Sequence, residues 1–415
     1  MIDRFDRSII AMLGGLLMIL TGVLTQDEAV RGVDFNTLGL LTGMMVLVSV
    51  ARRTGVFEFL AVWSMQSVKG SPAGLLCALA SVTALMSAVL DNVTTVLLVA
   101  PITLSIARCL RVPPFPFLLA EVMASNIGGT ATLIGDPPNM LIGSAADLSF
   151  NDFLIHLAPV VAVVMAAQLF AMQALWGRGM TASAAARAEL MKLVPASSIT
   201  DRRLLCQALA VFAVVLLGFM TSQTTGLRPG TIALTGAVAL MLIENLAHHR
   251  DQQFINVSAA YGGIDWITVF FFTGLFIVVH GVQATGILDW LARLITQSTQ
   301  GRLAVTVSVI LWASALISAV VDNIPFVAAM IPLIKAIAPA FGGDSAILPF
   351  WVALSLGACL GGNGTLIGAS ANLTVAGIAE RESISFGFVT YTKHALPLTA
   401  IGLVVCQIYL ALRYF

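Results

Sequence analysis

The chain has 415 residues, of which 58% are hydrophobic and 10% are charged, with 21 basic and 21 acidic side chains. Soluble globular proteins carry roughly 25% charged residues, so this composition, with a mean hydropathy of +0.96, excludes a soluble protein and predicts many membrane spans. The net charge of zero gives no basic surface for a nucleic acid. The five cysteines lie scattered without CxxC or Cys/His spacing, so we predict no disulfide framework, no metal site and no cofactor.

The first apolar run follows a short charged N-terminus and is not followed by a small-residue cleavage site. We therefore predict a retained first span rather than a signal peptide. Amphipathic pieces at 55–69 and 286–300 are typical of helices at the membrane surface. The runs predicted as ordinary spanning helices are 8–24, 34–52, 155–176, 204–220, 229–244, 265–283 and 394–413.

Two apolar segments, about 72–110 and 303–341, are interrupted midway by an Asp-Asn pair. The pairs are Asp91-Asn92 and Asp322-Asn323. Each segment has two readings, as two full helices or as one re-entrant hairpin with Asp-Asn at its tip. A carboxylate beside an amide at the end of a half-helix favours the hairpin.

Two longer runs, about 115–146 and 346–378, contain polar breaks. The first break is SNIGGTATLIGDPPN (125–139), where glycines and adjacent prolines stop an apolar helix. The second is GGNGTLIGASAN (361–372), and five of eight positions from the first TLIG onward recur 233 residues later. Freed backbone in a bilayer is tolerated only inside protein or beside water. A broken helix near the midplane is the usual construction of a transporter's binding site.

The repeat extends beyond these motifs, since Asp34, Gly55 and Pro101 recur at an offset of 231 as Asp265, Gly286 and Pro332. An odd number of crossings between the copies gives them opposite orientation. We predict an all-α membrane protein, an inverted-topology repeat with two re-entrant hairpins and two broken transmembrane helices. The predicted units are residues 1–178, a cytoplasmic linker at 179–203, and residues 204–415.

Basic residues indicate the orientation of this fold. The loop at 26–34 is acidic and falls on the other side of the membrane from the basic clusters. We expect nine full spans in a cell inner membrane, with a cytoplasmic N-terminus and an external C-terminus. The clustered basic residues are Arg4, Arg7, Arg52, Arg53, Lys69, Arg108, Arg111, Arg178, Arg187, Lys192, Arg202 and Arg203.

Three carboxylates are predicted to couple transport to a proton or an ion: Asp91, Asp322 and Asp136. A charge in the hydrocarbon centre is costly and is functional by default. The structural alternative is that Asp91 and Asp322 cap half-helices. Asp136 breaks the repeat, since its counterpart is Ala369, and it is either a second titrating group or a cap before Pro137.

Neutral hydrogen-bonding side chains cluster around the same breaks and are predicted to bind substrate. The alternative is that they satisfy backbone groups released by the breaks. Glu121 has two readings, as a proton relay or a packing contact, and the soft sulfur of Cys359 suits a thiophilic metalloid. The predicted substrate-binding residues are Asn92, Thr94, Asn126, Thr130, Thr132, Asn139, Asn323, Asn363, Thr365 and Asn372.

No phosphate loop is present, because GGTATLIG lacks Gly-Lys-Ser/Thr and follows no strand. No constellation suggests a hydrolase, so we predict a protein that is not an enzyme. The energy must come from an ion gradient or from a partner such as a cytoplasmic ATPase.

The motifs LDNVTTVLLVAP (90–101) and SNIGGTATLIGDPPN, repeated as VDNIPFVAAMIP (321–332) and GGNGTLIGASAN, resemble the ArsB/NhaD permeases of the ion transporter superfamily. The likeness is greatest to arsenical pump membrane proteins and the P protein branch, and it covers essentially the whole chain. It implies a scaffold part and a moving transport part. It also implies secondary active transport of arsenite and antimonite, or of Na⁺ against protons.

Related sodium-coupled dicarboxylate carriers have Ser-Asn-Thr at the hairpin tip, where this chain has Asp91-Asn92-Val93 and Asp322-Asn323-Ile324. Carboxylates in place of hydroxyls suit a proton or a neutral solute, and arsenous acid is uncharged near neutral pH. We predict proton-coupled efflux of arsenite or antimonite by antiport. The alternatives are a Na⁺/H⁺ antiporter, a channel, and a small-carboxylate carrier, which the absence of an intramembrane arginine disfavours.

Overall fold

The computed structural model describes residues 6–415 except 178, 193, 247, 344 and 345, and leaves out the side chains of 287–290. The described residues form helices and no strands. Seven of these helices are long and apolar enough to cross a membrane. The first half contains α1 (Arg7–Leu20), α2 (Gln26–Gly32), α3 (Phe35–Arg52), α4 (Val56–Ser67), α5 (Pro72–Ser87), α6 (Asn92–Leu110), α7 (Phe115–Thr130), α8 (Pro137–Ala146), α9 (Phe150–His156), α10 (Ala158–Met172) and the π-helix η2 (Gln173–Gly177).

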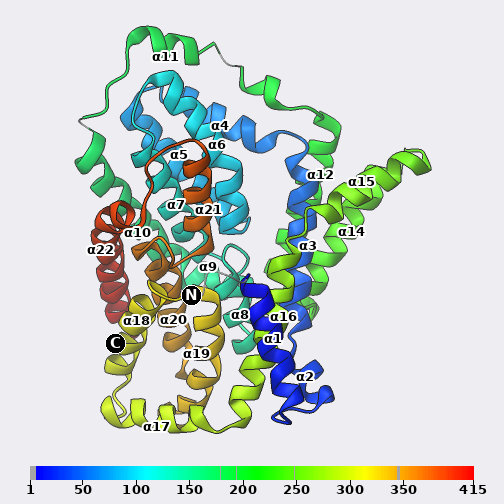
Figure 1. Cartoon of the computed structure of the whole chain (residues 1–415), viewed down its shortest axis with the longest axis vertical. Helices are drawn as coiled ribbons and strands as arrows, with labels where there is room; N and C mark the ends of the chain where they lie inside the picture. Colours follow the sequence, from blue (N-terminus) through cyan, green and yellow to red (C-terminus); the bar gives the residue numbers. More distant parts are fainter. Residues whose placement is uncertain (1–5, 178, 193, 247, 344–345) are drawn as a thin grey trace.

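The linker carries α11 (Ala184–Leu190) and η3 (Pro195–Ser198). We call the end of the molecule where α11 lies the linker face, and the end where α17 lies the opposite face (Figure 1). The second half contains α12 (Arg202–Met220), α13 (Ser222–Thr225), α14 (Pro229–Asn245), α15 (Arg250–Gly262), α16 (Trp266–Ala284), α17 (Ile287–Ser298), α18 (Leu303–Ser318), α19 (Asn323–Ile337), η4 (Ala338–Phe341), α20 (Leu348–Gly361), η6 (Gly362–Gly364), α21 (Ser370–Arg381) and α22 (Phe388–Tyr414).

The helices form two parts, both of which mix the two halves of the sequence (Figure 1). The scaffold part consists of α1–α3, α12 and α14–α16, and the transport part of α5–α10 and α18–α22. In the scaffold part, α1 packs on α16 and α14 packs on α3. In the transport part, α5 packs on α7 and α18 packs on α20. The helices α4 and α17 connect the two parts at the two faces.

Glycines at repeat-related positions allow the close helix crossings of the scaffold part. A Cβ added at Gly43 of α3 would lie 2.6 Å from the carbonyl carbon of Ala233 in α14. A Cβ at Gly274 of α16, the repeat counterpart of Gly43, would lie 2.4 Å from the carbonyl carbon of Ala11 in α1. Only glycine permits this close approach of two helix backbones. The same crossing is therefore built twice, once in each half.

Both Asp-Asn pairs lie at the tips of helical hairpins, as predicted. The helix α6 begins directly after Asp91, whose Oδ1 accepts a hydrogen bond from the Thr94 backbone N–H at 2.8 Å. The helix α19 begins directly after Asp322, whose Oδ1 accepts from the Ile324 backbone N–H at 3.1 Å. Aspartate is well suited to this position because its carboxylate accepts from unpaired first-turn N–H groups. The α5–α6 hairpin occupies the linker-face half and the α18–α19 hairpin the other half (Figure 1).

The predicted breaks are also present, between α7 and α8 and between α20 and α21. A threonine ties each break to the end of a hairpin. The Thr132 hydroxyl donates to the Ala88 carbonyl at 2.6 Å and accepts from the Gly135 N–H at 3.1 Å. The Thr365 hydroxyl donates to the Ala319 carbonyl. The fold class predicted from the sequence is thus confirmed.

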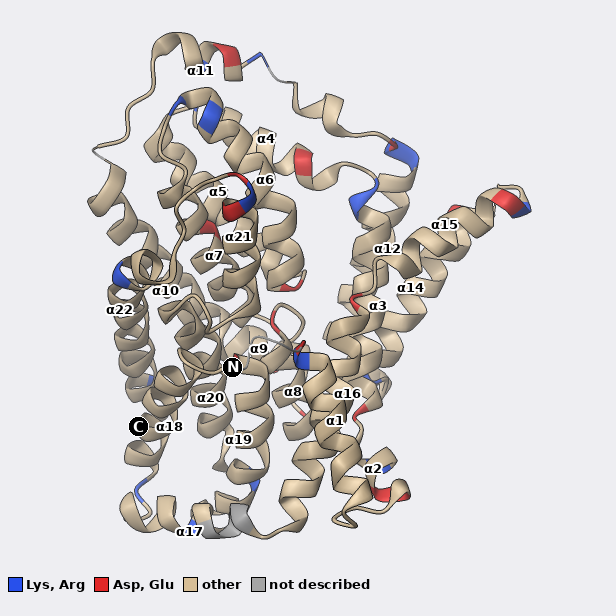
Figure 2. Ribbon diagram, viewed as in Figure 1, with Lys and Arg blue, Asp and Glu red and all other residues tan. Residues whose placement is uncertain are grey.

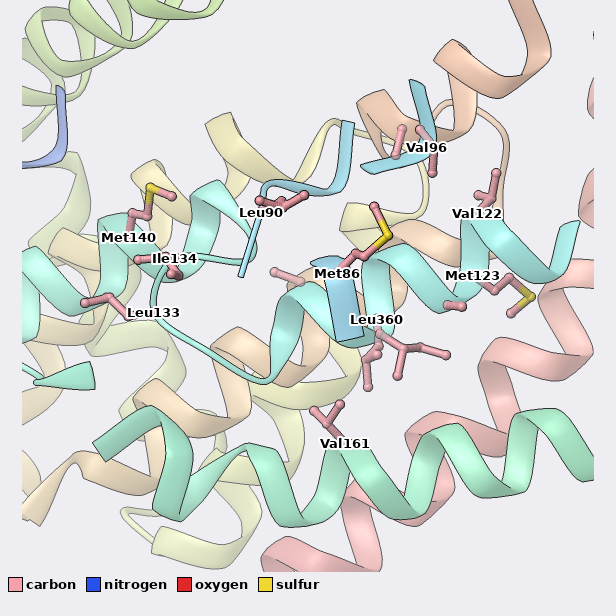
Figure 3. Close-up of a cluster of buried hydrophobic side chains, with 14 of the residues drawn as sticks. Met86, Leu90, Val96, Val122, Met123, Leu133, Ile134, Met140, Val161 and Leu360 are labelled. Atoms are coloured by element: carbon pink, nitrogen blue, oxygen red, sulfur yellow. The ribbon is translucent and has the colours of Figure 1, made fainter. Parts of the chain in front are cut away.

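An apolar core surrounds the breaks in the transport part. Met86 of α5, Val122 of α7 and Leu360 of α20 are among its buried side chains (Figure 3). Charged residues lie mostly toward the two faces, but a basic residue is visible at the start of α1, midway between them (Figure 2). The first apolar run, predicted as a full span, is thus the 14-residue α1 starting near mid-height.

Candidate functional site

The centre of the transport part is a cluster of buried carboxamides contributed by both halves. Asn126 of α7 donates through Nδ2 to Oδ1 of Asn363 at 2.8 Å and to Oδ1 of Asn372 at 2.9 Å. Its own Oδ1 accepts from Nδ2 of Asn92 at 3.0 Å. All four side chains are buried. The breaks and the first hairpin tip therefore meet at one point, as a shared site requires.

Asp136, which precedes α8, lies beside this cluster and is fully buried. Its Oδ1 accepts from Nδ2 of Asn92 at 3.2 Å. Its Oδ2 has no hydrogen-bond partner among the described residues. The side chains of Asn323 and Cys359 lie next to the carboxyl group. A buried carboxylate oxygen without a partner is costly, and a proton or a small cation at Oδ2 would supply the missing interaction.

Asn139 and Asn372 hold the backbone of the two breaks. Asn139 Nδ2 donates to the carbonyl of Thr130 at 3.1 Å and to that of Thr132 at 2.9 Å. Asn372 Nδ2 donates to the carbonyl of Gly362 at 2.9 Å and to that of Thr365 at 2.8 Å. These amides satisfy carbonyl groups that the interrupted helices leave unpaired. The amide nitrogens of Asn139 and Asn372 therefore satisfy backbone groups released by the breaks, which is the structural alternative to substrate binding.

The hydroxyl of Thr130 likewise donates to the backbone, to the carbonyl of Asn126 at 2.7 Å. Asn139 Oδ1 accepts a hydrogen bond from Ser355 Oγ at 2.6 Å, and the thiol of Cys359 lies 3.7 Å from the same oxygen. The first break is therefore also attached to α20 of the second half. This arrangement leaves little freedom for the central amides to reorient.

A cavity of about 380 Å³ lies between the carboxamide cluster and the scaffold part, and we call it the first cavity. Ser49 and Arg52 line it at the linker-face end of α3. Seven predicted residues are not among those that line it: Asn126, Thr130, Thr132, Asn139, Asn363, Thr365 and Asn372. The predicted residues that line it are Asp91, Asn92, Thr94, Asp136 and Asn323.

Arg7 also lines the first cavity, and it joins the scaffold part to the second hairpin tip. Its Nη1 lies 3.0 Å from Oδ2 of Asp322 and 2.5 Å from Oγ of Ser370. Its Nη2 lies 3.4 Å from Oγ1 of Thr268 in α16, and the guanidinium sits 5.1 Å from the centre of the Phe271 ring. One residue thus contacts both parts of the molecule.

The position of Arg7 corrects two sequence-based expectations. The sequence groups Arg7 with the cytoplasmic basic residues because it precedes the first apolar run, yet α1 starts deep in the molecule and brings Arg7 to the first cavity. The second expectation is the absence of an intramembrane arginine. The sequence does contain a signal that Arg7 belongs to the repeated unit. Arg7 directly precedes the predicted run 8–24, and Arg228 directly precedes the corresponding run 229–244 of the second half. Arg4 and Arg178 lie outside the described residues.

Carboxylates outnumber guanidinium groups around the first cavity. Asp91, Asp136 and Asp265 line it, against Arg7 and Arg52. The charge of Arg7 is matched by Asp322. Because Coulomb interactions strengthen in a low-dielectric interior, this arrangement favours protons, cations and neutral solutes over polyanions.

Glu121 is buried in α7 and does not line the first cavity. One of its carboxyl oxygens accepts a hydrogen bond from the Thr103 hydroxyl. The other has no hydrogen-bond partner among the described residues. Its contact with Thr103 joins α6 and α7 within the transport part.

Comparison with known proteins gives the family. The model of the CitMHS family, described as a citrate transporter, matches residues 1–357. The chain is 40% identical over 417 residues to an uncharacterized transporter of Mycobacterium tuberculosis, covering 100% of this chain and 95% of the relative. It is 31% identical over 489 residues to the P protein of Sus scrofa, covering 98% of this chain and 57% of that protein.

A solved structure shares the fold. The crystal structure of the YdaH transporter of Alcanivorax borkumensis, described as having an unusual topology, matches with a TM-score of 0.65 at 15% identity and covers 98% of both chains. These matches agree with the expected superfamily, while the ArsB/NhaD branch stays a prediction. The chain belongs to the CitMHS family of membrane transporters within the ion transporter superfamily.

Proposed function

We propose that the protein is a proton-coupled antiporter that exports a small uncharged solute, with arsenous and antimonous acid as the candidate substrates. The observation that carries the proposal is Asp136, a fully buried carboxylate with one oxygen lacking a partner, placed against neutral amides at the wall of the first cavity. Such a carboxylate can exchange a proton for a neutral solute without leaving a charge buried and unpaired.

The composition of the first cavity supports an uncharged substrate. The Asn92 carbonyl oxygen Oδ1, the Asn323 amide and the Thr94 side chain provide hydrogen-bonding groups, as the hydroxyl groups of arsenous acid need. The surplus of carboxylates disfavours a trianion. The thiol of Cys359, next to Asp136, adds a soft ligand near the same point.

The proposed direction is export across a cell inner membrane with the linker face in the cytoplasm. Lys69, Arg108, Arg111 and Arg187 lie near the ends of helices toward this face, and basic residues are enriched in cytoplasmic loops. The first cavity extends toward the linker face along α3. In this orientation it would load solute from the cytoplasm, while Asp136 would carry a proton inward during the return.

A second candidate is a small-carboxylate carrier. The family description favours it, as does Arg7 in the first cavity, since a guanidinium binds carboxylates well. In that case the substrate would have to compete with Asp322 for Arg7. A Na⁺/H⁺ antiporter is the remaining alternative, with Na⁺ at the carboxylates.

Flux measurements in proteoliposomes separate these functions. The purified full-length protein is reconstituted, an acid-inside pH gradient is imposed, and uptake of arsenite, citrate and ²²Na⁺ is compared in parallel. The proposal predicts accumulation of arsenite that stops when the gradient is collapsed by an ionophore. Accumulation of citrate without arsenite would support the carboxylate carrier, and exchange of Na⁺ alone would support the sodium antiporter.

A further inference from the structure

Arg7 and Arg228 lie at the starts of corresponding helices in the two halves. Arg7 is the first residue of α1, and Arg228 lies directly before the first residue of α14. These helices make equivalent contacts, α1 with α16 and α14 with α3, through the close approaches at Gly274 and Gly43. The inverted repeat therefore places an arginine at the start of each of two symmetry-related helices.

The two arginines differ in their contacts in this conformation. Arg7 pairs with Asp322 at the tip of the second hairpin. Arg228 is exposed and lines a second cavity of about 480 Å³ together with Asn36 and Ser144, on the opposite-face side of α8. Asp91, the repeat counterpart of Asp322, lies at the first cavity. Among the described residues, neither Arg228 nor Asp91 forms an ion pair.

We propose that Arg7 and Arg228 are alternating positioning residues for the transport movement. Arg7 holds the second hairpin tip through Asp322 in the conformation described here, and Arg228 holds the first hairpin tip through Asp91 in the conformation that faces the other side. Inverted repeats reach their opposite-facing state when the two halves exchange conformations about a fixed site. Exchange of the halves converts the Arg7–Asp322 contact into an Arg228–Asp91 contact.

This exchange has an energetic consequence. When the second hairpin leaves Arg7, the carboxylate of Asp322 and the guanidinium lose their pairing, and formation of the equivalent pair compensates for the loss. The free energies of the two end states then stay similar, which transport in repeated cycles requires. Removal of one arginine should bias the population toward the conformation that the other arginine stabilises.

The inference needs only the membrane-transporter fold and its movement, so it does not depend on arsenite as the substrate. Crosslinking tests it directly, because each pair joins the two halves of the chain. A protease site is inserted in the linker near Thr181, and the halves then separate on a gel unless a disulfide joins them. The variants are Arg7→Cys with Asp322→Cys, and Asp91→Cys with Arg228→Cys. The parent with its native cysteines is the control.

Both pairs should crosslink under oxidation, and each crosslink should stop transport until it is reduced. The contradicting result has two parts. The Arg7→Cys/Asp322→Cys variant forms its crosslink, whereas the Asp91→Cys/Arg228→Cys variant forms none although it transports solute before oxidation. In that case the proposal is wrong. If the cysteine variants have lost transport, a second measurement decides the outcome.

The second measurement follows the population of the described state by labelling Ser49→Cys in the first cavity with a membrane-impermeant thiol reagent. Arg7→Gln should lower the labelling rate and Arg228→Gln should raise it, each by about two- to fivefold, the range expected for a partly exposed ion pair. Arg7→Lys should restore part of the rate, and Thr181→Cys in the linker should label equally in all variants. Shifts in the same direction, or no shifts, would overturn the inference.

Discussion

Asn126 and Asn363 join the two halves of the protein at the centre of the transport part, with Nδ2 of Asn126 donating to Oδ1 of Asn363 at 2.8 Å. The two residues are not repeat counterparts, because the position that matches Asn126 in the second half is Cys359. The centre is thus asymmetric, although the frame around it is symmetric. Divergence after duplication has left an amide at this position in the first half and a thiol in the second.

Asn126→Ala should reduce both stability and transport. The substitution leaves Asn92 Nδ2 with Asp136 alone and deprives Asn363 and Asn372 of the donor to their Oδ1 atoms. Each unpaired buried group costs about 1–3 kcal/mol, so we expect a lower melting temperature in detergent and loss of solute flux. The control is Asn151→Ala, which removes an exposed hydrogen bond to the Met220 carbonyl. Equal melting temperatures for the two variants would show that the hydrogen bonds of Asn126 within the amide cluster do not stabilise the protein.

Thr132→Val should loosen the first break without changing the shape of the side chain. Thr132 both donates to the Ala88 carbonyl and accepts from the Gly135 N–H, so we expect a loss of about 1–3 kcal/mol in the free energy of unfolding. The matched control is Thr374→Val, because the Thr374 hydroxyl only donates back to the Ser370 carbonyl within α21. Thermal unfolding of both variants, followed by intrinsic fluorescence, checks the difference. A Thr132→Val variant as stable as the control would contradict the role assigned to this threonine.

Gly43→Ala and Gly274→Ala should destabilise the scaffold to similar extents. The added Cβ would lie 2.6 Å and 2.4 Å, respectively, from backbone atoms of the partner helix, and backbone cannot move aside as a side-chain end can. Overpacking of this kind costs about 1–3 kcal/mol. Gly377→Ala in α21 is the control, since nothing lies within 4 Å of the added atom. The yield of monodisperse protein and its melting temperature report the effect, and an unchanged Gly274→Ala variant would argue against the duplicated crossing.

The hairpins and breaks could be predicted because their signals are local and occur twice. Asp-Asn in the middle of an apolar run and TLIG followed by asparagine predict interruptions wherever they stand. The sequence does not predict the position of Arg7, because counting basic residues near an apolar run assumes that the run crosses the whole membrane. Two of the polar partners of Arg7, Asp322 and Ser370, lie more than 300 residues away in the sequence, and only the fold brings them together.

The different roles of the asparagine side chains also became apparent only from the structure. Asn139 and Asn372 share one motif position and both bind freed carbonyls. Asn92 and Asn323 share another position and line the first cavity. The sequence places all four residues at interruptions, but the backbone path decides which amides are already occupied. The roles of Asp91, Asp322 and Asp136 in proton or ion coupling stay predictions that transport experiments must address.

Arsenite flux by the Asp136→Asn variant tests the proposed mechanism most directly. Wild-type protein, Asp136→Asn, and the control Asp147→Asn at the exposed C-terminal end of α8 are reconstituted side by side, and arsenite accumulation is measured with and without an acid-inside pH gradient. We predict gradient-driven accumulation in the wild type and in Asp147→Asn, and at most downhill equilibration in Asp136→Asn. Gradient-driven accumulation by Asp136→Asn at the wild-type rate would contradict a mechanism in which the buried carboxylate carries the proton.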